Sequence, residues 1–146
     1  MSRFGKWRAA HLRLGSAGEK AAARMFRNSG CDVLLRDYKV RKGEIDLIVR
    51  DGKNLVFAEV KTRRAKNKTQ AQSFRPAQAL RQKQKQRIYR AAFTYMQEIG
   101  KPEIPYRFDL IEVIFLRSRL YKMRHWRSHF GVRNMKRTEQ RINLFR

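Results

Sequence analysis

Asp46, Glu59 and Lys61 are charged residues in two largely apolar segments of the chain. Asp46 lies within residues 44–50, and Glu59 and Lys61 lie within residues 55–61, both rich in Ile, Leu, Val and Phe. A buried carboxylate without a partner is costly, so it must be paired, protonated or bound to a cation. Two facing acids indicate a divalent ion, because Mg²⁺ and Mn²⁺ prefer carboxylate, carbonyl and water oxygens. The alternative is a structural ion pair with Lys61 or a nearby arginine.

A β-hairpin is expected to position these side chains. The turn formers Asp51, Gly52 and Asn54 separate the two apolar segments. A loop at residues 51–54 would set Asp46 directly across from Glu59, whereas a tighter turn at residues 51–52 would set the two acids diagonally. In either register they share a face with Lys61, with the carboxylates roughly 5 to 8 Å apart.

A fourth acid, Glu19, precedes the hairpin. Ser16 lies three residues before it, which is a capping-box pattern, so the sequence predicts a helix from Ser16 to about Asn28. On this pattern alone Glu19 is either a helix cap or a further acid of the site. Residues 1–14 carry four basic residues and no acid, and are expected to form a mobile basic arm.

The remaining elements predict a mixed sheet. Residues 32–39 are expected to form a short strand, residues 62–75 a flexible loop, and residues 76–98 a helix that begins at Pro76. An apolar strand follows at residues 106–116, where Asp109 and Glu112 are expected near solvent or paired with Arg107. Because a long helical crossover joins this strand to residues 55–61, the two strands are expected to be parallel.

The charge of the chain indicates a polyanionic partner. The formal net charge is +24, and no acid occurs between Glu59 and Glu98, where 11 Lys or Arg occur. Nucleic acid is favoured over a membrane surface, and DNA over RNA. Recognition is expected through shape, since no base-reading motif is present. The expected contacts are Arg63, Arg64, Lys66, Lys68, Arg81, Lys83, Gln84 and Lys85.

Other features of the sequence point to a single cytoplasmic domain. The basic opening lacks the apolar core of a secretory signal, and Cys31 is the only cysteine. The tail, residues 117–146, is expected to be a basic extension, helical in part. There Trp126 and Phe130 would either stack on unpaired bases or anchor the tail on the core. His125 and His129, four apart, are poor support for zinc.

Three segments of the chain resemble a known family. The segments "GEKAAARMF", "GEIDLIVRDGKNLVFAEVKTR" and "YRFDLIEV" are similar to the YraN-like predicted bacterial endonucleases, over roughly residues 14–114. The order Glu19, Asp46, Glu59 and Lys61 resembles the PD-(D/E)XK nuclease superfamily, and is similar to archaeal Holliday-junction resolvases. The resemblance implies a restriction-endonuclease-like α/β fold, with a mixed β-sheet core flanked by helices in residues 15–116.

The resemblance also implies an activity. It is metal-dependent hydrolysis of phosphodiester bonds in DNA, with branched or single-stranded DNA as the expected substrate. Asp46, Glu59 and the carbonyl of Val60 would hold Mg²⁺ or Mn²⁺, Glu19 would complete the shell, and Lys61 would orient or activate water. The alternative is a non-catalytic nucleic-acid-binding protein that retains the fold. A homodimer would suit two-strand cleavage, which needs two centres.

The chain departs from the family pattern at three positions. Asp37 and Lys39 stand where the family often has Asn and Arg, and Gln84 stands near a position that often holds Lys. We expect Asp37 to add negative charge near the site and so to weaken phosphate binding. Gln84 falls within the apolar stripe of its helix, where it is either a satisfied helix amide or a group of the site.

Overall fold

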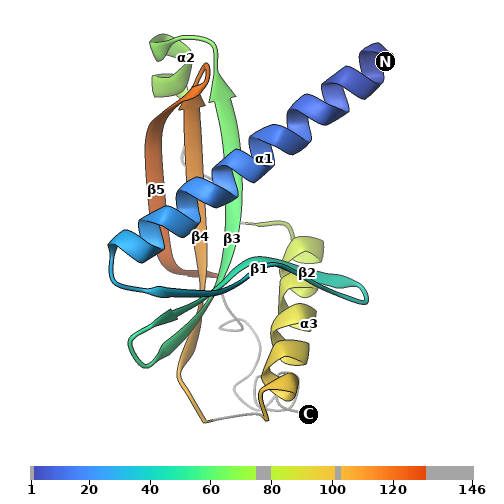
Figure 1. The fold of residues 1–146 in the computed structure, drawn as a ribbon, viewed down its shortest axis with the longest axis vertical. Helices are drawn as coiled ribbons and strands as arrows, with labels where there is room; N and C mark the ends of the chain where they lie inside the picture. Colours follow the sequence, from blue (N-terminus) through green and yellow to red (C-terminus); the bar gives the residue numbers. More distant parts are fainter. Residues whose placement is uncertain (1, 75–79, 101–102, 131–146) are drawn as a thin grey trace.

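The computed structural model describes residues 2–74, 80–100 and 103–130, with residues 129 and 130 described by their backbone alone. Figure 1 shows its helices and strands. In chain order they are α1 (Arg3–Asn28), β1 (Asp32–Val40), β2 (Gly43–Asp51), β3 (Asn54–Ala65), α2 (Lys68–Ser73), α3 (Gln82–Glu98), β4 (Tyr106–Leu116) and β5 (Arg119–Phe130).

The strands form one five-stranded sheet in the order β1-β2-β3-β4-β5. The pairs β1–β2, β2–β3 and β4–β5 are antiparallel. β3 and β4 are parallel, with Leu55 opposite Tyr106 and Ala65 opposite Leu116. Parallel neighbours need a long crossover, which here contains α2 and α3. The predicted α/β fold with a mixed sheet flanked by helices is therefore confirmed.

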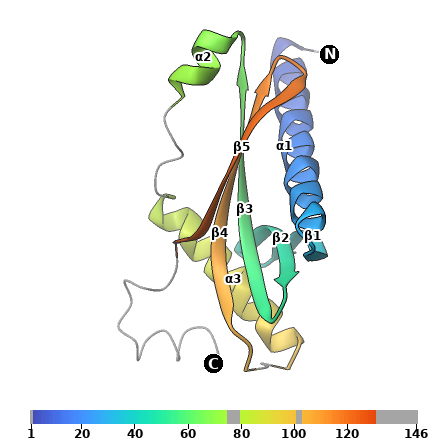
Figure 2. The same ribbon diagram turned by 90° about the vertical axis from the view of Figure 1, so that its left-hand side faces the viewer.

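Helices α1 and α3 lie on opposite faces of the sheet, as the edge-on view in Figure 2 shows. Ala22 and Phe26 of α1 pack in one core cluster with Val56 of β3. Ile88 and Met96 of α3 pack in another, which includes alternate residues of the same strand. β3 is thus buried on both faces, which explains why its sequence is almost continuously apolar.

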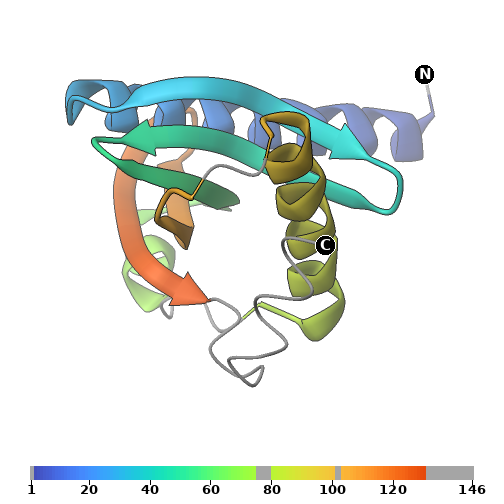
Figure 3. The same cartoon turned by 90° about the horizontal axis from the view of Figure 1, so that it is seen from below.

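Helix α1 begins earlier than its sequence pattern suggested. Ser2 is the N-cap, and its Oγ accepts a hydrogen bond from the N–H of Gly5 at 3.0 Å. The prediction that the helix starts at Ser16, after a separate basic arm at residues 1–14, is wrong, because residues 3–14 already belong to α1. Residues 3–14 are rich in Ala, Leu, Arg and Lys, which favour helix. In Figures 1 and 3 this part of α1 projects past the strands.

The end of the described chain is a strand of the sheet. The prediction that the basic extension is partly helical is wrong for residues 119–130, because β5 pairs there with β4. Charged side chains are typical of edge strands, where they discourage pairing with other chains, so the strand pattern of β5 is masked by Arg and Lys. Residues 131–146 lie outside the described residues.

The crossover also differs from its prediction. β3 extends to Ala65, and α2 follows with Asn67 as its N-cap, so the predicted loop at residues 62–75 contains regular structure. α3 begins at Gln82 and not at Pro76, since Arg81 has the extended backbone of an N-cap. Residues 75–79 lie outside the described part of the chain.

Two glycines allow α1 and α3 to approach the strands closely. A Cβ placed on Gly18 of α1 would lie 1.9 Å from Oγ1 of Thr62. A Cβ on Gly43, at the start of β2, would lie 2.7 Å from the carbonyl oxygen of Arg87 in α3. Such distances are far below van der Waals contact, so both positions require glycine.

In the described part of the chain, no helix is both long enough and apolar enough to cross a membrane.

Candidate metal centre

The site lies where β2 and β3 part. The β2–β3 ladder runs from Asp51 opposite Asn54 to Leu47 opposite Ala58 and ends there. This is the register of the loop at residues 51–54, one of the two that the sequence left open. β2 stays paired with β1 as far as Gly43, whereas β3 continues beside β4. Asp46 and Glu59 are the next residues beyond the last pair, so both carboxylates stand at the fork.

Carboxylates from three elements converge at this fork. Glu19 of α1, Asp37 of β1 and Asp46 of β2 each place an oxygen within 4.8 Å of the others. Oδ2 of Asp46 accepts a hydrogen bond from the N–H of Val60 at 2.8 Å, which ties β2 to β3 beyond the end of their ladder. Asp46 therefore lies at the centre of the group, fixed by the backbone of β3.

A pocket of about 560 Å³ holds these groups. Its lining includes the predicted residues Glu19, Asp46, Glu59, Val60 and Lys61, so the structure brings all of them to one pocket. Glu59, predicted as a direct ligand beside Asp46, is not part of the 4.8 Å cluster. The remaining lining residues are His11, Leu12, Leu14, Gly15, Ser16, Asp37, Lys39, Glu44 and Thr62.

Burial and mutual repulsion make these acids hard to ionise. Burial, then the charges of Asp46 and Asp37, raise the pKa of Glu19 from 4.5 to about 7. Burial, then the charge of Asp46, raise the pKa of Glu59 from 4.5 to about 9, although Lys61 lowers it. Burial also raises the pKa of Asp46, against the hydrogen bond from Val60. A cation bound among these oxygens would offset both the burial of the charged carboxylates and their mutual repulsion.

The donor set fits Mg²⁺ or Mn²⁺. Every group within the 4.8 Å cluster is a carboxylate, which is a hard oxygen ligand, and one pocket holds further acids beside it. Nζ of Lys61 lies 3.8 Å from Oε1 of Glu59. A single partly exposed lysine does not balance this many acids. The ion-pair alternative weighed from the sequence therefore accounts for Glu59 alone.

Asp37 is the residue of the site that the sequence prediction missed. It was expected only to weaken phosphate binding, yet it belongs to the carboxylate cluster. Its neighbours pair across β1–β2, Arg36 with Leu47 and Tyr38 with Ile45, which sets Asp37 across from Asp46. Its φ is 55°, in the left-handed region that Asp tolerates better than most residues. Recognising the tight turn at residues 41–42 would have revealed this pairing.

The predicted nucleic-acid contacts lie elsewhere, and none of the eight lines the carboxylate pocket. Lys66 and Lys68 line a separate groove of about 550 Å³ together with Arg117 of the β4–β5 turn and Arg119 at the start of β5. Gln84 serves as a helix cap, because its Oε1 accepts from the N–H of Arg81 at 3.2 Å. The other predicted contacts are exposed except for Arg63, which lies over the ring of Phe74, and Lys85, which is half-buried.

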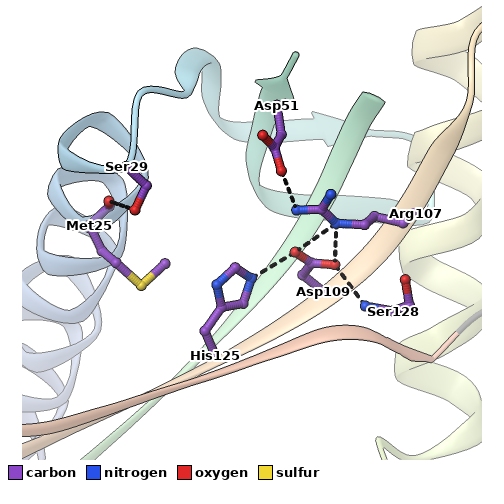
Figure 4. Close-up of polar contacts among 7 residues, drawn as sticks. All are labelled: Met25, Ser29, Asp51, Arg107, Asp109, His125 and Ser128. Atoms are coloured by element: carbon purple, nitrogen blue, oxygen red, sulfur yellow. Dashed lines mark hydrogen bonds and ion pairs between the residues drawn. The ribbon is translucent and has the colours of Figure 1, made fainter. Parts of the chain in front are cut away.

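A second group of buried charges is drawn in Figure 4. Asp109 is fully buried, and accepts from Nε of Arg107 at 3.0 Å and from the N–H of Ser128 at 3.0 Å. His125 lies 2.7 Å from it, and Arg107 also bridges to Asp51 at 2.9 Å. Burial would raise the pKa of Asp109, but these partners outweigh it and lower it.

This network corrects one expectation and confirms another. Asp109 and Glu112 are both fully buried, so neither lies near solvent. The expected pairing with Arg107 is confirmed for Asp109, whereas Glu112 pairs with Arg124 of β5 at 3.2 Å. Because every described acid here has a cationic partner, we assign the network to holding β4, β5 and the β2–β3 turn together.

Comparisons with known proteins place this architecture in a family. The model of the uncharacterised protein family UPF0102 matches residues 18–113, a range that includes the whole carboxylate cluster. The UPF0102 protein STH1475 of Symbiobacterium thermophilum is 42% identical over 101 residues, covering 69% of this chain and 81% of its own. The UPF0102 protein of Pelotomaculum thermopropionicum is 38% identical over 118 residues, covering 80% and 94%. The UPF0102 protein CT2262 of Chlorobaculum tepidum is 38% identical over 124 residues, covering 82% and 92%.

Proposed function

We propose a function for this chain, which belongs to the uncharacterised protein family UPF0102, from its carboxylate pocket. It is a metal-dependent endonuclease that hydrolyses phosphodiester bonds in DNA, with a site of the PD-(D/E)XK kind. The family match confirms the YraN-like resemblance at the level of the family. The family's description states no activity, so the nuclease assignment rests on the residues.

One observation carries the proposal. Glu19, Asp37 and Asp46 come from three different elements, and their oxygens lie within 4.8 Å of one another. These acids lie at a fork in the sheet, where burial and the neighbouring carboxylates raise the pKa of Glu19 and of Glu59 in spite of nearby cations. Groups held at such cost are typical of sites that bind a cation or transfer protons.

The residues of the pocket would have distinct roles in metal binding and hydrolysis. Glu19, Asp37 and Asp46 would hold the ion, and Glu59 would join them once its proton is displaced. A bound Mg²⁺ supplies Lewis acidity and a water of lowered pKa, the chemistry that phosphodiester hydrolysis needs. Lys61, beside Glu59, would place its ammonium against a phosphate oxygen or orient the attacking water. The ring of acids repels a phosphate until the cation is present, so metal and DNA should bind cooperatively.

The net charge of +24 supports DNA as the partner. Lys66, Lys68, Arg117 and Arg119 line one groove, which suits contacts to a phosphate backbone. Contacts of this type carry no sequence information and weaken steeply with salt. The proposed enzyme therefore recognises the shape of its DNA.

Two measurements on purified full-length protein test the proposal. The first is calorimetric titration with Mn²⁺. The second is cleavage of single-stranded, duplex and branched DNA in Mg²⁺ or Mn²⁺. Asp46→Asn should abolish both the binding heat and the cleavage, because it removes the central carboxylate. Glu44→Gln is the matched control, since Glu44 lines the same pocket but pairs with Arg87 at 3.3 Å.

The outcomes separate two functions. Manganese binding through Asp46 together with cleavage supports the nuclease. The nuclease proposal is refuted if wild type and Asp46→Asn bind DNA equally, the titration with Mn²⁺ shows no binding heat, and no form of DNA is cleaved. The chain would then be a non-catalytic nucleic-acid-binding protein.

A further inference from the structure

The first three turns of α1 carry a column of exposed rings. The ring centroids of Phe4 and Trp7 are 6.1 Å apart, and those of Trp7 and His11 are 5.3 Å apart with planes inclined by only 17°. Phe4 is 71% exposed and Trp7 is 61% exposed. Spacings of three and four residues set the rings on one side of the helix. Exposed aromatic groups of this size are unusual unless they serve binding.

This column leads into the carboxylate pocket. His11 is its last ring and also lines the pocket, as do Leu14, Gly15 and Glu19 further along the helix. At 1.5 Å of rise per residue, His11 and Glu19 are separated by about 12 Å along the axis. The rings and the proposed ligand Glu19 are therefore carried by one rigid helix, so a molecule lying on the rings would be directed towards the acids.

The charges around the rings indicate which kind of molecule the rings bind. Arg3, Lys6, Arg8 and Arg13 are the ionised residues between Ser2 and Leu14, where no acid occurs. Two copies of this helix face would bring like charges together, which disfavours self-association. Aromatic side chains interspersed with cations are the combination that binds single-stranded nucleic acid, since the rings stack on bases and the cations contact phosphates.

We propose that residues 3–14 of α1 bind an unpaired DNA strand next to the site of cleavage. The inference rests on the proposed function and narrows its substrate to DNA with a single-stranded part. An unpaired base exposes a face on which Phe4 or Trp7 can stack, whereas in a duplex neighbouring base pairs cover the faces. The segment should therefore distinguish single-stranded from double-stranded DNA without reading sequence.

Binding is best measured where cleavage cannot interfere. Fluorescence anisotropy in EDTA, with Asp46→Asn as the parent protein, would compare a labelled oligothymidine with a labelled duplex of equal length. Adding Trp7→Ala should weaken binding of the single strand by roughly tenfold, the loss typical of one base–aromatic stack. Binding of the duplex should change less than about twofold. Because Trp7 is exposed, the substitution should leave the thermal midpoint unchanged.

Three further variants act as controls. Trp7→Phe retains a ring and should recover most of the affinity. Leu34→Ala removes a different exposed apolar side chain, 42% exposed on β1, and should have no effect. Lys6→Ala should weaken both DNA forms alike, because it removes only a phosphate contact.

The results distinguish this inference from the nuclease proposal. Selective loss of single-strand binding supports the inference, even if no DNA is cleaved and the nuclease proposal fails. Equal losses on both forms, or no loss, overturn the inference. The inference is also overturned if the wild type cleaves single-stranded DNA and Trp7→Ala cleaves it equally well. A dimer that Trp7→Ala converts to monomer in sedimentation would assign the rings to a second copy, and would also overturn it.

Discussion

Replacing Glu59 with glutamine should make the metal-free protein more stable at neutral pH, although it removes a residue of the proposed site. In the fold, burial and the charge of Asp46 raise the pKa of Glu59 from 4.5 to about 9. An acid with a raised pKa in the folded state gives stability that is complete below its unfolded pKa. That stability is lost progressively as the pH rises from about 4.5 to about 9.

The size of the effect follows from the shift. Each pKa unit is worth about 1.4 kcal/mol, so the wild type should lose about 3 kcal/mol of unfolding free energy between pH 4.5 and pH 7 through Glu59. Glutamine is neutral in both states and can still donate a hydrogen bond to Asp46. Glu59→Gln should therefore recover up to about 3 kcal/mol at pH 7, which for a chain of this length is on the order of 10 °C in thermal midpoint.

Urea denaturation in EDTA at several pH values between 5 and 8.5 would measure this, followed by thermal melts with and without Mn²⁺. The variant should show a flatter dependence of stability on pH than the wild type. It should also gain less from Mn²⁺, because one carboxylate is missing. Glu44→Gln, from the same pocket, should shift stability by less than about 0.5 kcal/mol, as expected of an exposed ion pair.

A structural role for Glu59 predicts the opposite sign. If the ion pair with Lys61, 3.8 Å away, were the reason for Glu59, its loss would destabilise the protein at neutral pH. A lower unfolding free energy for Glu59→Gln in EDTA, with an unchanged gain from Mn²⁺, would refute the reasoning on which the metal centre depends.

Three other outcomes are expected. Gly18→Ala should destabilise the fold by about 1 to 3 kcal/mol in urea denaturation, because the added methyl group overpacks α1 against β3. Gly15→Ala, with open space around its Cβ, should not destabilise it. Equal effects would contradict the close approach of α1 to β3 at Gly18. Arg107→Ala should cost about 2 to 3 kcal/mol by the same measurement, because buried Asp109 would keep, among its described partners, only His125 and the N–H of Ser128. A loss below about 1 kcal/mol would show that Arg107 is dispensable to the network. The Mn²⁺ affinity measured by calorimetry should rise between about pH 5 and pH 8, because the ion must displace protons from acids such as Glu19, whose pKa is raised to about 7. An affinity that does not change with pH would argue against ligation by these acids.

Much of the centre of the fold could be predicted from local patterns. The turn formers at residues 51–54 and the apolar runs beside them predicted the hairpin, and its register is one of the two expected. The long crossover predicted that β3 and β4 are parallel. These features succeed because strand pairing across a short loop, and the geometry of a crossover, depend on nearby residues.

Local patterns failed where other parts of the chain decide the outcome. Ser16 and Glu19 have the spacing of a capping box, yet α1 begins at Arg3 because residues 3–14 also favour helix. β5 was missed because an edge strand needs few apolar residues, and its Arg and Lys resemble those of a tail.

The sequence by itself determined which groups are available for chemistry. Asp46, Glu59 and Lys61 could be singled out because charges in apolar strands are costly wherever the strands lie. Only the tertiary structure decided that Glu19 meets the acids of the strands. Glu19 and Asp37 reach Asp46 because α1 packs closely on β3 at Gly18 and because β1 pairs with β2. The tight turn at residues 41–42 is a local pattern that encodes the pairing of Asp37 with Asp46. The distance from Glu19 to these carboxylates depends on how α1 packs on β3, and no local pattern in the chain encodes it.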